Sequence, residues 1–331
     1  MRALVCEGTG QRPIVRHVPR PRPRPGEVVV AVSAASINSP DNLMIAGGYQ
    51  IRPACPFVVG CEFAGHVAEV GQQVDRWSSG DPVMGTCFTG AFAEQVCVPA
   101  ARLLPVPAEV AIDIAAALPV AGRTAVQALV FEGETSPGDR VVVLGAAGGV
   151  GHFCVQVARR LGGHVVAVAS GAERRAFCVT VGASTTLDAR QPDLKEQLRL
   201  ATDGGADVVV DLVGGHLSEV ALRASRWGAR FVTAGFASGS IPAIPLNLVL
   251  LKGVQIRGVE TRALTEHHPE RIREGDELLA ELLRQGLRPR ITARYPLDRA
   301  ADGLSALSRR QSVGKLLVDI ATSSQPKDTH P

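Results

Sequence analysis

Hydrophobic and polar positions along the first 120 or so residues follow a short period. Apolar or alternating runs such as "EVVVAVSAASI", "FAGHVAEVG" and "DPVMGTCF" are separated by glycine and proline. Runs of this length between such residues are typical of β-strands joined by tight turns. The pattern predicts a strand-rich, barrel-like domain.

From about Gly122 the pattern changes to apolar strands that alternate with helical segments. "RVVVLG", "HVVAVAS", "ADVVVDLVG" and "ARFVTAGF" are almost continuously apolar, and a helical period follows each of the first three. Such strands are typical of a parallel sheet covered by helices on both faces. After about Arg262 an amphipathic helix, a strand and the stretch "GKLLVDI" follow.

These patterns predict an α/β chain of two domains, in keeping with a length of 331 residues. We expect one domain to begin with residues 1–122, a doubly wound domain to cover residues 123–262, and a further segment to cover residues 263–331.

A glycine-rich loop follows the strand "RVVVLG". Ala146, Gly148 and Gly151 have the spacing of a dinucleotide-binding fingerprint, and a helix and a second strand follow at the expected distance. Glycine lets the backbone approach a pyrophosphate, which the helix N-terminus attracts. We expect contacts from Ala147, Gly148, Gly149 and Val150. The loop lacks the GK[ST] ending of a nucleoside triphosphatase.

The end of the second strand indicates which dinucleotide binds. NAD-binding proteins usually carry an acid there, whereas this chain reads Ala169-Ser170-Gly171, with Arg174 and Arg175 in the next helical turn. Arginine pairs bidentately with phosphate. We therefore expect NADPH, bound in part by Ser170, Arg174 and Arg175. Alternatively, Glu173-Arg174-Arg175 is an ordinary solvated turn.

Composition excludes several other classes of protein. Apolar residues make up 46%, the formal net charge is +3, and the seven cysteines never form a CxxC pair, which argues against a disulfide framework and a structural zinc site. The basic stretch from Arg16 to Arg24 alternates with proline and lacks aromatics, so we interpret it as a connector and expect no nucleic-acid partner. No apolar run reaches about 18 residues, and we expect a cytoplasmic enzyme without a membrane partner.

Several stretches together carry a specific resemblance that covers nearly the whole chain. They are "NSPDNLMIAGGYQIRPACPFVVGCEFAGHVAEVG", "GAFAEQVCVPA", "LPVAGRTAVQAL", "GDRVVVLGAAGGVG", "GFASGSIPAIPLNLVLLKGVQIRGV" and "GKLLV". The chain resembles the zinc-free quinone oxidoreductase branch of the medium-chain dehydrogenase/reductase superfamily. The resemblance implies a GroES-like, partly open β-barrel catalytic domain formed by residues 1–122 and 263–331. It also implies a Rossmann doubly wound parallel sheet over residues 123–262 that binds NADPH. A homodimer joined through the sheet edge near Val254 to Val259 is implied as well.

The zinc alcohol dehydrogenases of the same superfamily allow the metal ligands to be compared position by position. This chain has Asn38 and Cys61 at two ligand positions, and the segment "LPVAG" offers no third. Cys61 and Glu62 alone do not make a tetrahedral site. We therefore expect no metal, and an acceptor that needs little activation: a quinone or an α,β-unsaturated carbonyl, a small molecule in either case.

The resemblance also implies the residues around the nicotinamide and the acceptor. Asn38, Asp41 and Tyr49 line the cleft; Asn38 is suited to bonding a ribose or substrate oxygen, and Tyr49 to donating a proton. Turn chemistry for Asn38 and Asp41, and loop packing for Tyr49, are the alternatives. The remaining cofactor contacts are Thr124, Val213, Gly214, Phe236, Ala237, Ser238 and Lys315, the last with a structural role as its alternative.

Two departures from the family pattern leave the acceptor open. Many relatives have a tyrosine where this chain reads Ala121-Gly122-Arg123, and a tryptophan-glycine pair where it reads Glu260-Thr261. The leading hypothesis is NADPH-dependent reduction of a quinone or enone. The alternatives are a dedicated enoyl reductase of a polyketide or acyl thioester intermediate, and an NADPH-binding protein with a non-catalytic role.

Overall fold

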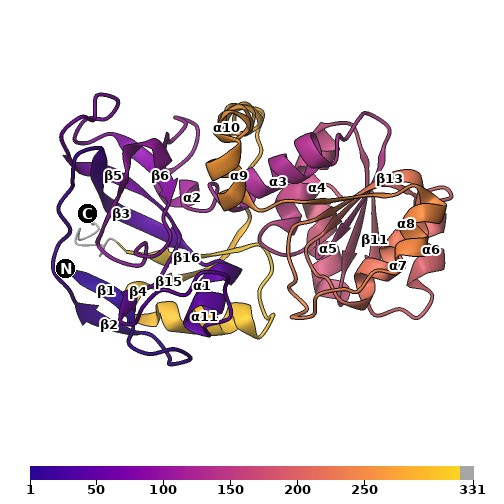
Figure 1. The fold of residues 1–331 in the computed structure, drawn as a ribbon, viewed down its shortest axis with the longest axis horizontal. Helices are drawn as coiled ribbons and strands as arrows, with labels where there is room; N and C mark the ends of the chain where they lie inside the picture. The colour runs from indigo at the N-terminus through magenta and orange to yellow at the C-terminus, as the bar shows by residue number, and fades with distance from the viewer. Residues whose placement is uncertain (321–331) are drawn as a thin grey trace, which may run out of the picture. The chain divides into compact units, whose positions relative to one another are not determined.

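The computed structural model describes residues 1–320, and its internal contacts divide the chain into two units (Figure 1). Among the described residues, unit 1 comprises Met1–Pro119 and residues 291–320, and unit 2 is Val120–Arg290. Residues 263–290, expected in the catalytic domain, therefore lie in unit 2. The reason is that α10 (Pro269–Arg284) packs on α3 (Ala121–Val126), where Arg123 Nε lies 2.8 Å from Asp276 Oδ1.

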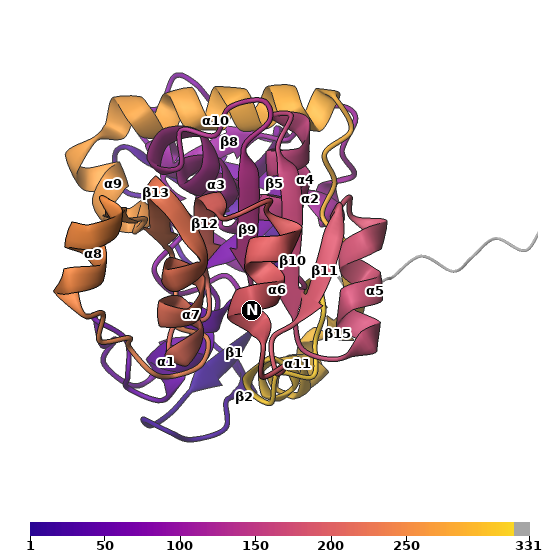
Figure 2. The same ribbon diagram turned by 90° about the vertical axis from the view of Figure 1, so that its right-hand side faces the viewer.

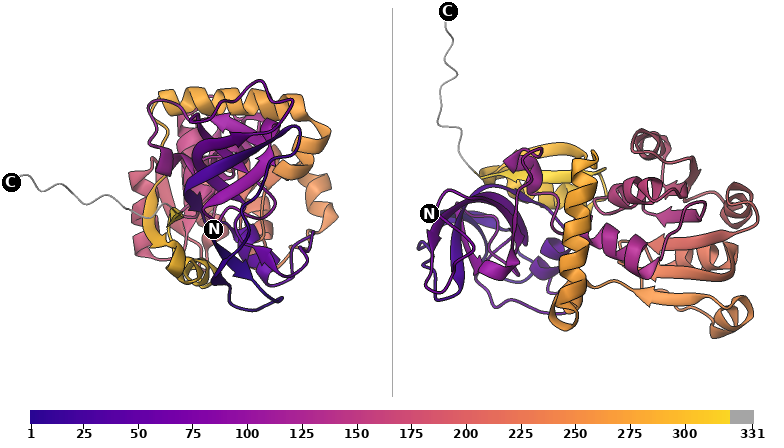
Figure 3. Two further views of the ribbon diagram at one scale, coloured as in Figure 1. Left: turned by 90° about the vertical axis from the view of Figure 1, so that its left-hand side faces the viewer. Right: turned by 90° about the horizontal axis from the view of Figure 1, so that it is seen from above.

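Unit 1 is built from two sheets that use both ends of the chain. The smaller has the order β2-β1-β4 and the larger β15-β16-β3-β5-β6-β8, with β7 also paired to β3. β16 runs antiparallel to β3, so C-terminal strands lie beside strands from the first hundred residues (Figure 3). Phe63, Phe92 and Leu103 lie in its core, to which the C-terminal segment adds Leu297 and Val318. The strands are β1 (Arg2–Cys6), β2 (Ile14–His17), β3 (Glu27–Ser36), β4 (Phe57–Val58), β5 (Glu62–Val70), β6 (Pro82–Thr86), β7 (Gln95–Pro99), β8 (Leu103–Pro105), β15 (Ile291–Pro296) and β16 (Lys315–Asp319).

Short helices complete unit 1. They are α1 (Ser39–Ile45), η1 (Ala100–Arg102), α2 (Ile112–Ala115), η3 (Leu297–Arg299) and α11 (Ala300–Ser308). The amide of Asn42 in α1 donates to the backbone oxygen of Leu304 in α11, with 3.0 Å between the atoms. α1 is thereby fixed at the position where it follows β3, directly after Asn38.

Unit 2 contains one sheet with the order β11-β10-β9-β12-β13-β14, in which every neighbouring pair is parallel. The predicted doubly wound sheet is thus confirmed. Val142, Val166 and Val209 share a core with residues of α6, α7 and α8, while α3 and α4 cover the opposite face (Figure 2). Burial on both faces explains why these strands are almost entirely apolar. The strands are β9 (Arg140–Leu144), β10 (His164–Ala169), β11 (Thr185–Asp188), β12 (Ala206–Asp211), β13 (Ser225–Thr233) and β14 (Gln255–Gly258).

The helices α4 to α8 lie between these strands along the chain, whereas α3 and η2 precede the strands and α9 and α10 follow them. The helices of unit 2 are α3, the π-helix η2 (Gln127–Glu132), α4 (Gly151–Arg160), α5 (Ala172–Thr180), α6 (Leu194–Ala201), α7 (His216–Ala224), α8 (Leu246–Lys252), α9 (Thr261–His267) and α10. Across residues 1–320, no helix combines the length and the apolar character needed to cross a bilayer.

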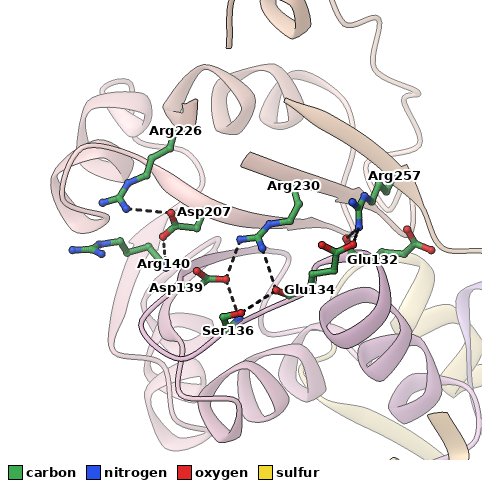
Figure 4. Close-up of polar contacts among 9 residues, drawn as sticks. All are labelled: Glu132, Glu134, Ser136, Asp139, Arg140, Asp207, Arg226, Arg230 and Arg257. Carbon is green, nitrogen blue, oxygen red and sulfur yellow. Dashed lines mark hydrogen bonds and ion pairs between the residues drawn. The ribbon is translucent and has the colours of Figure 1, made fainter. Parts of the chain in front are cut away.

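Charged side chains tie together the amino-terminal ends of the strands in unit 2 (Figure 4). Asp207 accepts hydrogen bonds from the backbone N–H of Arg140 at 2.7 Å and from the guanidinium of Arg226 at 3.1 Å. Arg230 binds Asp139 at 3.0 Å and the backbone oxygen of Glu134 at 3.1 Å. The loop before β9 is therefore held against β12 and β13 at the edge opposite the carboxyl-terminal ends, which are the usual ligand edge of such sheets.

Candidate functional site

The glycine loop lies between β9 and α4 and has the geometry of an anion site. Gly148 N–H donates to Gly145 O at 3.0 Å, and a Cβ at residue 151 would lie only 2.2 Å from that same oxygen, so only glycine fits there. Within residues 1–320, the N–H groups of Gly149, Val150 and Gly151 donate to no protein atom. Unpaired N–H groups at the start of a ten-residue helix are suited to bind a phosphate.

A carboxylate from β11, Asp188, lies beside the carboxyl end of β10 and was not identified from the sequence. Asp188, the last residue of β11, is the register partner of Ala169, and one of its oxygens accepts from Gly171 N–H at 3.3 Å. Arg190 binds Asp188 through Nε and Nη2, both at 3.1 Å, and Arg175 Nη1 lies 3.5 Å from it. Hydrogen bonds from Arg190 lower the pKa of Asp188, which is therefore ionised at neutral pH.

This arrangement corrects the expectation that no carboxylate stands near Ser170. An acid is present, but it comes from the neighbouring strand and is engaged by two arginines. The signal that could have found it is the strand order of a doubly wound sheet, which puts the third strand along the chain, "STTLD", beside the second. With Arg174 and Glu173, the group has three guanidinium groups against two carboxylates, an excess of one positive charge.

The loops after β12 and β13 hold each other through backbone hydrogen bonds, so the structure brings together most of the residues expected there. Ser238 N–H donates to Val213 O at 2.8 Å and Ala237 N–H to Leu212 O at 3.1 Å. Gly214, at φ +72°, packs under Phe236: a Cβ at residue 214 would lie 2.9 Å from its ring. The expected contacts Val213, Gly214, Phe236, Ala237 and Ser238 thus form one surface at the carboxyl edge of the sheet.

Asp211 orders this surface and was not singled out from the sequence. It is fully buried at the end of β12, where Oδ1 accepts from the N–H groups of Val213 and Gly214 at 2.8 and 2.9 Å. Its Oδ2 accepts from the hydroxyl of Ser218 at 2.5 Å. The carboxylate thus fixes both the loop and the first turn of α7. An acid at the end of the apolar run "ADVVVD" was the available signal.

Thr124 lies in α3 of unit 2 and is almost buried. Its hydroxyl donates to the backbone oxygen of Val120 at 2.7 Å. The hydrogen of the hydroxyl is thereby used within the helix, and the oxygen keeps its capacity to accept. The contact of Thr124 with the nicotinamide stays a prediction.

In unit 1, Asn38 takes part in a closed polar network with two buried charges. Its amide nitrogen donates to Ser36 O at 3.0 Å and to Glu62 Oε2 at 2.8 Å, and its Oδ1 accepts from Lys315 Nζ at 2.8 Å. Lys315 also lies 3.0 Å from Glu62, and both side chains are essentially fully buried. Both amide hydrogens of Asn38 are used, so its side chain can offer a ligand only a lone pair on Oδ1.

Lys315 was expected among the cofactor contacts, and the structure gives it the structural role considered as the alternative. Its ammonium group is directed at Asn38 and Glu62 inside unit 1. The interaction joins β16, β5 and the start of α1, three segments that are far apart in the sequence. Lys315 therefore holds the side chain of Asn38 in place.

Asp41 lies in the first turn of α1 and is fully buried. Its Oδ2 accepts from the backbone N–H of Asn38 at 2.7 Å, an interaction typical of a capping box. Burial raises the pKa of Asp41 to about 7, although the Asn38 N–H and the neighbouring Cys61 oppose that shift. Asp41 is thus a carboxyl group that titrates near neutral pH and that holds the backbone of Asn38 in place.

The donor set of this region does not fit a zinc ion. Burial raises the pKa of the Cys61 thiol well above its usual value, so the sulfur keeps its proton, and Glu62 is paired with Lys315. Across the part of the chain that the structure describes, no three or more His, Cys, Asp or Glu side chains group in a way that could hold a metal. Tetrahedral zinc requires three or four such ligands, with cysteine as thiolate.

Tyr49 is half-buried in the loop that follows α1. The loop begins with Gly47 at φ +70°, and Gly48 N–H donates back to Leu43 O at 2.9 Å, which anchors the loop to the end of the helix. The segment thus holds the phenol of Tyr49 on the same short stretch of chain as Asn38 and Asp41. Its role as a proton donor stays a prediction.

Comparison with known proteins places both units. Residues 24–108 match the alcohol dehydrogenase GroES-like domain, and residues 149–281 match the zinc-binding dehydrogenase family. The quinone oxidoreductase-like protein 2 of Bos taurus is 35% identical over 323 residues, which cover 96% of this chain and 92% of that protein.

Two further similarities concern solved structures and larger enzymes. The quinone oxidoreductase of Thermus thermophilus, whose structure is known also in complex with NADPH, has a TM-score of 0.85 and 30% identity, covering 97% of this chain and 100% of that one. A mycocerosic acid synthase-like polyketide synthase of Mycobacterium tuberculosis is 30% identical over 302 residues, which are 89% of this chain but 14% of that protein. Full-length similarity above 30% shows the family. The chain belongs to the quinone oxidoreductase branch of the medium-chain dehydrogenase/reductase superfamily, with a GroES-like domain and a Rossmann-type sheet.

Proposed function

We propose that the protein is an NADPH-dependent reductase of quinones or related α,β-unsaturated carbonyl compounds and that it works without a metal. The observation that carries the proposal is the relationship over nearly the whole chain to quinone oxidoreductases. The glycine loop supports the cofactor half of the proposal, since its N–H groups at the start of α4 are suited to a pyrophosphate.

NADPH is favoured over NADH by the arginines around Ser170. Arg175 and Arg190 are held in place by Asp188, so their guanidinium groups are ordered before a ligand arrives. A 2′-phosphate would meet the excess positive charge of this group, with Arg174 in the same helical turn. The ribose hydroxyl of NADH would meet only Asp188, which already accepts hydrogen bonds from Arg190 and Gly171.

Residues of this chain would bind and orient the reactants. NADPH, when bound, supplies the hydride that adds to the electrophilic carbon of the acceptor. Asn38, whose amide hydrogens are both engaged, would accept a hydrogen bond from a ribose hydroxyl through Oδ1. Tyr49 would donate a hydrogen bond, and finally a proton, to the oxygen that becomes negative as the hydride arrives.

The zinc-independence of the reaction rests on Lys315. The chain itself supplies a cation beside Asn38 and Glu62, and a second cation there would face an ammonium group about 3 Å from the same carboxylate. We therefore expect activity to survive exhaustive chelation. Near one zinc per chain in elemental analysis, with activity lost on its removal, would overturn this part of the proposal.

The decisive experiment is a screen of simple quinones, enones and enoyl thioesters as acceptors. The oxidation of NADPH is monitored by the decrease in absorbance at 340 nm. Turnover of several quinones supports the proposal. The polyketide synthase similarity favours the second candidate, a dedicated enoyl reductase, which predicts fast reduction of one enone or thioester and slow quinone turnover. Tight NADPH binding without oxidation by any acceptor would instead indicate a non-catalytic NADPH-binding protein.

We also propose a homodimer formed through β14, the terminal strand of the unit 2 sheet. Ile256 on this strand is 45% exposed, and Trp227 and Leu250 beside it are 80% and 81% exposed. An open strand edge flanked by apolar side chains is suited to pairing with a second copy.

Sedimentation velocity tests this assembly. Ile256→Lys should give monomers, because it places a charge on the paired edge. Leu200→Lys should leave the dimer intact, because Leu200, although 75% exposed, lies on α6 beside β11 at the other end of the sheet. A monomeric wild-type protein at tens of micromolar, or a dimeric Ile256→Lys variant, would contradict the proposal.

A further inference from the structure

A buried histidine connects the glycine loop to the last residues of unit 2. His152 lies in the first turn of α4 and is fully buried. Its Nδ1 lies 3.0 Å from Gly148 O in the loop, and its Nε2 lies 3.1 Å from the backbone nitrogen of Arg290. One ring therefore bonds the loop on one side and residue 290 on the other.

The second of these contacts fixes the tautomer of His152. A backbone N–H can only donate, so Nε2 carries no hydrogen and accepts from Arg290. In the neutral ring the hydrogen is then on Nδ1, which donates to Gly148 O. Phe153 and Phe177 flank the ring, with centroids 4.5 and 6.2 Å away, and keep it in place.

A second side chain of α4 binds the same segment one turn later. Gln156 donates to Arg288 O at 2.9 Å and accepts from Arg288 N–H at 3.4 Å. Residue 289 is proline and has no N–H, so every backbone N–H from 288 to 290 donates to a side chain of α4. The segment ends at Arg290, after which the chain passes into β15 of unit 1.

We propose that His152 is a positioning residue that transmits binding at the glycine loop to the segment Leu287–Arg290. The inference rests on the proposed binding of NADPH. A pyrophosphate that orders the loop also orders Gly148, and the ring of His152 carries this restraint to the N–H of Arg290. Cofactor binding thereby stiffens the exit from unit 2, which lies outside the glycine loop itself.

Two substitutions separate the arms of this link. The amide nitrogen of asparagine is as many bonds from Cβ as Nδ1 of histidine. His152→Asn should therefore keep the hydrogen bond to Gly148 O and lose the one from the N–H of Arg290. The amide oxygen of glutamine is as many bonds from Cβ as Nε2 of histidine. His152→Gln should therefore keep the hydrogen bond from the N–H of Arg290 and lose the one to Gly148 O. His164→Asn, at an exposed histidine near the amino end of β10, is the matched control.

Hydrogen exchange of the whole protein, read by mass spectrometry with and without saturating NADPH, tests the proposal. In the wild type and in His164→Asn, NADPH should slow exchange both at residues 149–151 and, about tenfold or more, at Arg290. In both His152 variants the loop should still be protected, while the slowing at Arg290 falls below about twofold.

The outcomes distinguish this inference from the proposed function. Protection of the loop without protection of Arg290 in the wild type overturns the inference alone. Equal protection of Arg290 in the wild type and both His152 variants shows that the ring has only a packing role and also overturns it. Absence of loop protection, with no NADPH binding, overturns the inference and the proposed function together.

Discussion

Asp188 and Arg190, two residues apart at the end of β11, form a doubly hydrogen-bonded pair whose carboxylate also accepts from Gly171. Arg190 is therefore a fixed positive group beside the first turn of α5, where Arg174 and Arg175 lie. Asp188 alone would favour a ribose hydroxyl. In this protein its carboxylate instead orients Arg175 and Arg190, whose positive charges favour a phosphate.

The first prediction follows from this pair. Wild-type protein should bind NADPH at least about tenfold more tightly than NADH, because a charge-assisted bond to a phosphate is worth roughly 1–3 kcal/mol. Arg174→Ala and Arg190→Ala should each weaken the binding of NADPH and leave the binding of NADH unchanged. Titration calorimetry measures the binding of both cofactors, with a substitution of the exposed Arg199 on α6, Arg199→Ala, as the control. Equal dissociation constants for the two cofactors in the wild type would refute the prediction.

A second prediction concerns the phenol of Tyr49. Tyr49→Phe should lower turnover roughly ten- to a thousandfold, the loss of one positioned donor, with little change in NADPH affinity. Enones should suffer more than quinones, because a hydroquinone anion is stabilised by its own ring. Steady-state kinetics with one acceptor of each kind measures the effect.

The chain has only one other tyrosine, which makes the control simple. Tyr295 is half-buried in β15 and packs against Gly303, so Tyr295→Phe should leave turnover unchanged. If Tyr49→Phe behaves like Tyr295→Phe with both acceptors, Tyr49 is a packing residue and the proton comes from solvent.

The third prediction addresses the buried pair Lys315–Glu62. Lys315→Met should destabilise the protein by about 3–5 kcal/mol, because it removes the ammonium group that lies 3.0 Å from the buried carboxylate of Glu62. Adding Glu62→Gln should recover much of this loss, since the buried negative charge is then removed as well. Urea unfolding of the two single variants and the double variant measures the coupling. Strictly additive losses would show that the two charges do not interact.

The fourth prediction concerns the pH dependence of stability through Asp41. The folded-state pKa of about 7 lies above the ordinary value of an aspartate, so the folded protein keeps a proton that the unfolded chain releases near pH 4. This contribution to stability is complete below about pH 4 and is lost as the pH rises through about 7.

Asp41→Asn removes this titration and keeps an oxygen for the N–H of Asn38. Relative to that variant, the wild type should lose on the order of 2–4 kcal/mol between about pH 4 and pH 8. Unfolding curves at several pH values measure the difference. Parallel stability profiles of the two proteins would mean that Asp41 titrates normally.

The periodicity of apolar residues and the composition predicted the larger features of the fold, because both patterns can be read from neighbouring residues in the sequence. The change from short alternating strands to buried strands with helices occurs near residue 122 in the sequence, and unit 2 begins at Val120. The end of unit 2 was placed too early, since α10 looks in sequence like any amphipathic helix. Its position depends on partners such as Arg123, about 150 residues away.

The candidate site divides in the same way. The glycine loop is a continuous stretch, and its geometry followed from the spacing of its residues. Asp188 and Lys315 depend instead on strand pairing: Asp188 reaches Gly171 because β11 lies beside β10, and Lys315 reaches Asn38 because β16 pairs with β3. Such neighbours are set by topology, which periodicity does not reveal.

The charged cluster around Asp207 and Arg230 lies at the amino-terminal ends of the strands, away from the carboxyl-terminal ends where ligands usually bind. The loops at the opposite edge, after β12 and β13, are held by their own backbone and by Asp211 rather than by this cluster. Changes in the segment 236–245 are therefore expected to leave the strand register intact, because the contacts that fix it lie at the opposite ends of the strands. The loops at the carboxyl ends can vary in sequence independently of the contacts that hold the sheet together.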